Sequence, residues 1–126
     1  FLGWCRKEEL PAIYRAADVF VLPSRDEGMS NALLEAMAAG VPALCTDVAG
    51  MRDVITPGET GLIVPPEDPD ALSKALLTLL TDTDLRARLG RAGRGHVVRR
   101  FSWTRAARSW RAILHRIAAP AGATAP

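Results

Sequence analysis

The chain has 126 residues, of which 48% are hydrophobic and 24% charged, and its formal net charge is +2. This composition is typical of one globular domain, and no apolar run approaches the ~20 residues that a membrane-spanning helix needs. The two cysteines, Cys5 and Cys45, exclude a disulfide framework, which favours reduced thiols in a cytoplasmic protein.

The first segment predicts the end of a strand followed by a helix. Residues 1–3 are mostly apolar, and the chain begins at Phe1 without a methionine, so we expect a truncated strand there. Residues 7–17 are predicted to form a helix with Glu8 and Glu9 in its first turn. Its buried face has the i, i+3, i+4, i+7 spacing of Leu10, Ile13, Tyr14 and Ala17.

Three short apolar runs predict buried strands at residues 19–22, 43–46 and 61–64. Uninterrupted apolar strands are typical of parallel sheets that are covered on both faces. A helix over residues 31–39 separates the first two strands, and we expect it to end at Gly40 in the left-handed conformation.

The rest of the chain predicts three helices. The first starts at Pro69 after the cap residue Asp68, the second covers residues 85–98, and the third follows Ser102. One face of the third helix is apolar, with Trp103, Ala107, Trp110, Leu114 and Ile117. Strands that alternate with helices predict an α/β fold, a Rossmann-like parallel sheet with flanking helices over residues 1–118. We expect residues 119–126 to be a disordered tail.

The charges divide the chain sharply. All 14 acidic residues lie at or before Asp84, whereas ten arginines lie between Arg86 and Arg116. Such a basic segment could contact an anionic membrane or an acidic partner surface, or could simply be a solvated face. Few aromatic residues accompany these arginines and no nucleic-acid motif is present, so nucleic acid is an unlikely partner.

The loop at residues 23–31 is the first candidate ligand site, because it joins a buried strand to the start of a helix. Ligands of open α/β sheets collect at the carboxyl ends of the strands, and helix starts bind phosphate through free amides. The amides expected to serve here belong to Met29, Ser30 and Asn31, with Gly28 allowing close approach. Ser30 also predicts an ordinary helix cap, a role compatible with phosphate binding.

Carboxylates are the second candidate feature of this region. Glu35 lies in an otherwise apolar helix, where we expect a buried carboxylate that leans back toward the phosphate site. Its partner is predicted to be a pair of sugar hydroxyls, or an arginine such as Arg25 or Arg52, and the spacing favours neither. At the rim of the loop the candidate is Glu27 or Asp26 beside it, unless both are solvated loop charges.

The stretch PSRDEGMSNALLEAMAAGVPALCTDVAGMRDVI resembles the signature region of retaining glycosyltransferases with the GT-B fold, family GT4, the glycosyl transferases group 1. Glu27 and Glu35 match the E-x7-E pattern of that family. The segments FLGW, LPAIYRAADVFVLPS, TPGETGLIVPP and RFSW also match in order, so the resemblance covers nearly the whole chain.

The resemblance implies a role for each candidate residue. Glu27 would be catalytic, contacting the donor sugar near the face where transfer occurs, and Glu35 would hold the ribose hydroxyls of the nucleotide. The amides of Ser30 and Asn31 would bind the diphosphate of the donor, with Gly28 and Met29 shaping its approach. The reaction would move a sugar from a nucleoside diphosphate to an acceptor hydroxyl with retained configuration, without a metal ion or other cofactor.

The departures from the family pattern define further expectations. Met29 and Ser30 replace a common Phe-Gly pair, and Asp53 replaces a common glutamate. The family's basic pair and its N-terminal acceptor-binding domain would lie upstream, so we expect this C-terminal donor-binding fragment to be inactive alone. The last helix would then cover that domain, or would bind anionic lipid at the inner face of the membrane.

Two other functions remain open from the sequence. One is a non-catalytic nucleotide-binding remnant, and the other is an adaptor that binds membrane or nucleic acid through its basic helices. His96 and His115 are distant from the signature loop in the sequence, and we expect both on the surface.

Overall fold

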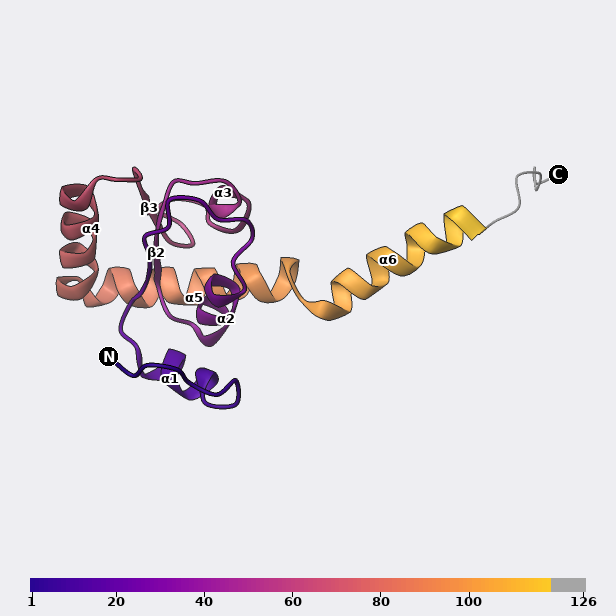
Figure 1. The fold of residues 1–126 in the computed structure, drawn as a ribbon, viewed down its shortest axis with the longest axis horizontal. Coiled ribbons are helices and arrows are strands. Elements are labelled where there is room, and N and C mark those ends of the chain that lie inside the picture. The colour runs from indigo at the N-terminus through magenta and orange to yellow at the C-terminus, as the bar shows by residue number, and fades with distance from the viewer. Residues whose placement is uncertain (119–126) are drawn as a thin grey trace.

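The computed structural model describes residues 1–118, which form a three-stranded parallel sheet surrounded by helices (Figure 1). The strands are β1 (Phe20–Leu22), β2 (Ala43–Thr46) and β3 (Leu62–Val64), and their order in the sheet is β1-β2-β3. In the register, Leu22 pairs with Cys45 and Thr46 pairs with Val64. The predicted α/β class with a parallel sheet is confirmed.

The central strand β2 is buried on both faces. Ala43 and Cys45 belong to one core cluster, whereas Leu44 between them belongs to another, as the alternation of side chains along a strand requires. Burial raises the pKa of the Cys45 thiol to about 12, which keeps it protonated at neutral pH.

Six helices complete the described fold. They are α1 (Leu10–Ala16), α2 (Asn31–Ala39), α3 (Met51–Val54), α4 (Pro69–Thr81), α5 (Thr83–Arg100) and α6 (Trp103–Ala118). Helix α2 packs against β1, β2, α1 and α5, while α4 packs against β2, β3 and α5. Figure 1 shows α5 as a long helix that runs from α4, past α2, to the start of α6.

The ends of two helices follow the predicted capping. The Ser30 hydroxyl accepts a hydrogen bond from the Leu33 amide at 3.4 Å, and Gly40 ends α2 in the left-handed region with φ 89°. The Asp68 carboxylate accepts from the Ala71 amide at 2.8 Å, directly before Pro69. These caps explain why both ends of α2 and the start of α4 are readable from the sequence.

Helix α5 begins earlier than predicted, because the Asp82 carboxylate caps it by accepting from the Leu85 amide at 2.8 Å, and its glycines are used for packing. A Cβ at Gly90 would lie against the Gly40 carbonyl, and one at Gly93 would lie 2.8 Å from the Thr60 carbonyl oxygen. Glycine in a helix interior costs up to about 1 kcal/mol relative to alanine. Here it permits close approach of α5 to the end of α2 and to the turn before β3, and Leu89 and Val97 become buried.

Two predictions for the N-terminal segment are wrong. Residues 1–3 are not part of a strand and are exposed, since no strand of the described sheet pairs with them. Helix α1 begins at Leu10, so Glu8 and Glu9 precede it, and Pro11 stands at its start. The Glu9 carboxylate accepts hydrogen bonds from the backbone amide of Arg6 at 2.8 Å and from its guanidinium at 3.0 Å.

Helix α6 is predicted correctly in position, and the Ser102 hydroxyl accepts from the Arg105 amide at 3.4 Å. It extends away from the rest of the molecule (Figure 1), and none of its residues is buried. Its apolar face is exposed, including Trp103, Trp110, Leu114 and Ile117. Among residues 1–118 no helix combines the length and apolarity that crossing a membrane requires. The predicted disordered tail, residues 119–126, lies outside the described residues.

Candidate functional site

The loop between β1 and α2, residues 23–30, lies at the carboxyl edge of the sheet. Its start is fixed by β2, because the buried Thr46 hydroxyl donates to the Ser24 carbonyl at 2.5 Å. The Ser24 hydroxyl in turn donates to the Glu27 carboxylate at 3.3 Å. The strand that ends beside the loop therefore holds the backbone from which Glu27 projects.

The amides at the end of this loop are available to a ligand. Within residues 1–118, the amides of Met29, Ser30 and Asn31 donate to no protein acceptor. The Ser30 cap uses only the Leu33 amide, two residues beyond Asn31. Capping and anion binding are thus compatible here, because the positive end of α2 retains donors that the cap does not use.

Glu35 is exposed, which corrects the prediction of a buried carboxylate. Helix α2 buries Leu33, Ala36 and Met37, whereas Glu35 lies on a different face that the core does not cover. The Tyr14 hydroxyl donates to Glu35 Oε2 at 3.4 Å.

Neither arginine considered as a partner of Glu35 pairs with it. Arg52 binds the carboxylate of Asp47 through two nitrogens, at 2.7 and 2.5 Å, and this pairing lowers the pKa of Asp47. Arg25 forms an ion pair with Glu67 at 3.4 Å. Glu35 therefore has a carboxylate that is free to accept hydrogen bonds from a ligand.

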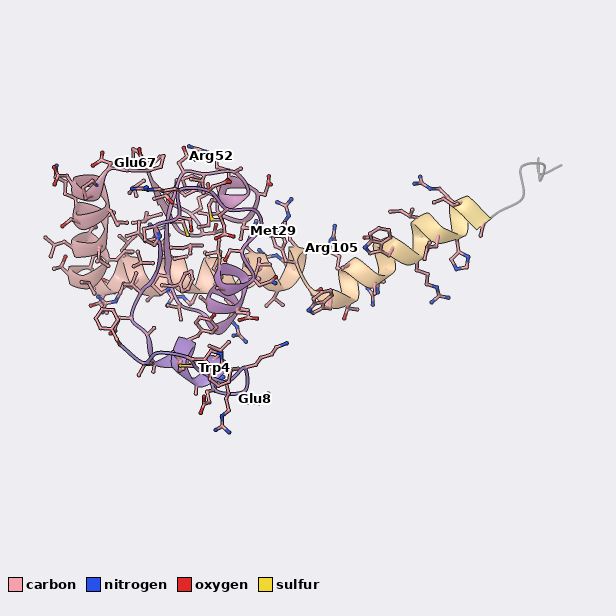
Figure 2. The ribbon with its side chains drawn as sticks, viewed as in Figure 1. Trp4, Glu8, Met29, Arg52, Glu67 and Arg105 are labelled. Atoms are coloured by element: carbon pink, nitrogen blue, oxygen red, sulfur yellow. The ribbon has the colours of Figure 1, made fainter. Side chains whose placement is uncertain are left out.

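A hollow of about 650 Å³ connects Glu35 with the start of α2. Met29, Asn31 and Glu35 line one side of it, and residues from the end of α5 and the start of α6 line the other. Figure 2 labels Met29 and Arg105, which both border this space. A smaller hollow of about 350 Å³ on the α1 side also includes Glu35, so this carboxylate stands between two open spaces.

The lining of the larger hollow is suited to an anionic ligand. Lys7, Arg100 and Arg105 contribute three cationic side chains, against the single carboxylate of Glu35. The sequence reasoning missed these three, because their role depends on three separate elements that meet only in the fold. Tyr14 was predicted as a core residue. Its pKa is raised by burial first and then by the neighbouring Glu35.

Glu27, Gly28 and Ser30 lie in the same loop but do not line the hollow. Glu27 is half-buried, while Asp26 beside it is exposed. Within residues 1–118, His, Cys, Asp and Glu side chains form no group of three that could hold a metal ion. The described geometry thus gathers Met29, Asn31 and Glu35 around one space and leaves Glu27 beside it.

His96 is half-buried, which corrects its prediction as a surface residue. Its Nε2 is buried without a hydrogen-bond partner among the described residues, and its ring lies 5.9 Å from that of Phe101. Its pKa is lowered by burial first, and then by Arg100 and Arg99. His115 on α6 is exposed, as predicted.

The family described as glycosyl transferases group 1 matches residues 1–96. A D-inositol 3-phosphate glycosyltransferase of Corynebacterium efficiens is 42% identical over 96 residues, which cover 76% of this chain and 22% of that protein. The chain thus spans less than a quarter of the length of this relative.

Solved structures of similar fold include sucrose-phosphate synthase from Thermosynechococcus elongatus. Its TM-score is 0.88 at 36% identity, over 93% of this chain and 29% of that one. The Anabaena protein HepE in complex with UDP-glucose has a TM-score of 0.85 at 21% identity, over 92% of this chain and 32% of that one, and supports the fold alone.

Proposed function

Because the chain belongs to the glycosyl transferases group 1 family, we propose that it binds a nucleoside diphosphate sugar at the start of α2 for transfer to an acceptor hydroxyl. The observation that carries this proposal is the hollow bordered by Met29, Asn31 and Glu35, next to amides with no protein acceptor.

The diphosphate occupies the positive end of α2. The amides of Met29, Ser30 and Asn31 donate to its oxygens, while Gly28 permits its close approach. Lys7 and Arg105 border the same hollow and add positive charge to it. When the bond between the sugar and the diphosphate breaks, negative charge grows on the leaving group, and donors that are already oriented stabilise that charge.

The ribose lies against Glu35. A carboxylate accepts hydrogen bonds from two adjacent hydroxyls, as an acidic residue does in dinucleotide-binding folds. The bond from Tyr14 to Oε2 restrains the Glu35 side chain on its α1 side and leaves Oε1 for the ligand. Since Glu35 is exposed and unpaired with any described cation, binding a neutral diol requires no ion pair to break.

Glu27 is proposed as the catalytic residue that contacts the donor sugar. Its carboxylate is held by Ser24, and the loop that carries it also carries the diphosphate amides. The sugar would be transferred with retention of its anomeric configuration and without a metal ion. The acceptor oxygen bonds to the anomeric carbon as the bond from that carbon to the diphosphate breaks, and the diphosphate leaves with the electron pair and takes up the proton of the acceptor hydroxyl.

We propose further that transfer requires residues beyond this chain, which spans 22% of its C. efficiens relative. An acceptor-binding domain would supply the second wall of the site. Support for the donor class comes from a Corynebacterium glutamicum relative, 39% identical over 110 residues, that is described as GDP-mannose-dependent. Placement in the cytoplasm stays a prediction.

The test is donor binding by the purified chain, measured calorimetrically with UDP and with GDP. Glu35→Ala should weaken binding of the nucleotide that the wild type prefers by about tenfold, because hydrogen bonds to a charged group are lost. The 2′,3′-dideoxy form of that nucleotide should bind both proteins equally, since it has no hydroxyls for Glu35.

The matched control is Glu59→Ala, which removes another exposed glutamate from a turn outside the hollow. It should leave binding unchanged. In a transferase that contains this chain, Glu27→Ala should lower kcat by more than it changes the KM for the donor. Equal affinity of wild type and Glu35→Ala for the complete nucleotide would exclude the proposed ribose site.

A further inference from the structure

Gly50 lies directly against the backbone of the donor loop. It has φ 81° and precedes α3. A Cβ at this position would lie against the Gly28 carbonyl oxygen, 2.6 Å from its carbon and 3.2 Å from the Met29 nitrogen. These are backbone atoms that cannot rotate away as a side chain does. The peptide between Gly28 and Met29 therefore rests on a position where only glycine fits.

This contact affects the direction of a diphosphate-binding amide. A trans peptide is planar, so its carbonyl oxygen and its N–H point to opposite sides. No cis peptide occurs among the described residues, and a Cβ at Gly50 would lie nearly as close to the Gly28 carbonyl carbon as to its oxygen, so Gly50 packs against the flat face of this peptide. The Met29 N–H is thus directed away from Gly28's carbonyl oxygen. Any rotation of this peptide that relieves a contact with Gly50 also turns the Met29 N–H.

The segment that carries Gly50 is itself firmly held. We define the buttress as Thr46 and residues 47–50, the connection from β2 to α3. The Asp47 amide donates to the Val64 carbonyl at 2.8 Å, and the Asp47 carboxylate binds Arg52 on α3. Thr46 holds the start of the donor loop through Ser24 at 2.5 Å, while Gly50 contacts its end.

We propose that the buttress fixes the diphosphate-binding amides in place, and that Gly50 is a positioning residue for the donor diphosphate. This inference rests on the proposed function for its ligand. It adds that the orientation of the Met29 and Ser30 amides is imposed by a different strand connection. Gly50 acts through the Gly28–Met29 peptide and does not itself touch the donor.

The decisive variant is Gly50→Ala, with Gly58→Ala as its matched control. Gly58 has φ 77°, so alanine meets the same left-handed strain there, but a Cβ at Gly58 has no atom within 4 Å. The difference between the two variants isolates the contact with the donor loop. Thr46→Val is a second variant, which releases the start of the loop and adds no atom near Gly28.

The first readout is amide hydrogen exchange in the 126-residue chain without ligand. Gly50→Ala and Thr46→Val should speed exchange of the Leu33 and Leu34 amides, which donate to Ser30 at the end of the loop, and Gly58→Ala should not. The second readout is affinity for UDP or GDP compared with the corresponding nucleoside. Gly50→Ala should weaken diphosphate binding by about tenfold, equivalent to the loss of one hydrogen bond to a charged group, and leave nucleoside binding unchanged.

The possible failures are distinguishable. If neither nucleotide binds the wild type, the proposed function is contradicted, whereas the exchange comparison still decides whether the buttress orders the loop. If Gly50→Ala and Gly58→Ala behave alike in exchange or in diphosphate affinity, Gly50 has no positioning role. Loss of nucleoside affinity equal to loss of diphosphate affinity would likewise overturn the inference, because it would indicate general damage to the fold.

Discussion

Helices α5 and α6 follow one another and are both rich in arginine, but α5 packs into the core and α6 does not. Helix α5 has three glycines and a poorly defined apolar face, yet it buries Leu89 and Val97. Helix α6 has a continuous apolar face with two tryptophans, yet it buries none of its residues. Amphipathic spacing therefore predicts that a helix forms, but burial also requires a second surface that fits it.

Their arginines differ in the same way. On α5, Arg86 donates to the carbonyls of Leu79 and Leu80 at 2.7 and 2.6 Å, Arg88 donates to Gly58 at 3.1 Å, and Arg94 donates to Ala38. Within residues 1–118, the side chains of the α6 arginines form no hydrogen bond or ion pair. The α5 arginines are thus partly structural, whereas those of α6, including Arg105 at the donor hollow, remain open to a ligand or partner.

The largest expected difference in stability is between two variants, one that truncates a buried leucine and one that truncates an exposed leucine. Leu89→Ala on α5 should lower the free energy of unfolding by about 3 kcal/mol, because it leaves a cavity in the core. Leu114→Ala on α6 should change it by less than about 0.5 kcal/mol. Urea unfolding measures both. A large loss of stability in Leu114→Ala would contradict the contrast between α5 and α6 and indicate that α6 is covered in solution.

A smaller contrast is expected between two glycines of α5. Gly90→Ala should destabilise the fold by about 2 kcal/mol, because its Cβ would press on the Gly40 carbonyl. Gly95→Ala should be neutral or stabilising by up to about 1 kcal/mol, since alanine favours the helix and only the mobile end of Arg99 is near. Equal destabilisation by both variants would show that close approach is not why Gly90 is required.

The smallest expected difference in stability is between an arginine variant of α5 and one of α6. Arg86→Met should destabilise the fold by about 1 kcal/mol, because two carbonyls at the end of α4 lose their donor. Arg111→Met on α6 retains a similar aliphatic chain and should have an effect within about 0.5 kcal/mol. Thermal unfolding monitored by circular dichroism would resolve the difference. A null result at Arg86 would mean that water replaces the guanidinium without cost.

Elements with strong local signals were predicted well from the sequence. The bounds of α2 and β2 match the prediction because a cap, a left-handed glycine and buried apolar runs mark them. The short helix α3 was missed, since four residues give no periodic pattern. The start of α1 was misplaced because Pro11 has no N–H to donate to the Lys7 carbonyl, so the helix can begin only with Pro11 in its first turn.

The candidate site was predictable in part, for a physical reason. The loop and its amides follow from the order of strand, loop and helix, which is local information. Exposure of Glu35 depends on which neighbours cover α2, and these come from α1 and from the end of α5. The contact between Gly28 and Gly50 joins residues 22 positions apart and depends on tertiary packing, so only the fold reveals it.

Because Cys45 is buried in β2, the rate at which its thiol is alkylated measures how often the sheet opens. A thiol reagent reaches this side chain only when the strands separate, because the thiol is fully enclosed and protonated at neutral pH. Cys5 lies outside the core and reacts without such opening. Pulses of an alkylating reagent, followed by mass spectrometry, would therefore count how often each molecule opens its central strand, with Cys5 as an internal standard in the same chain.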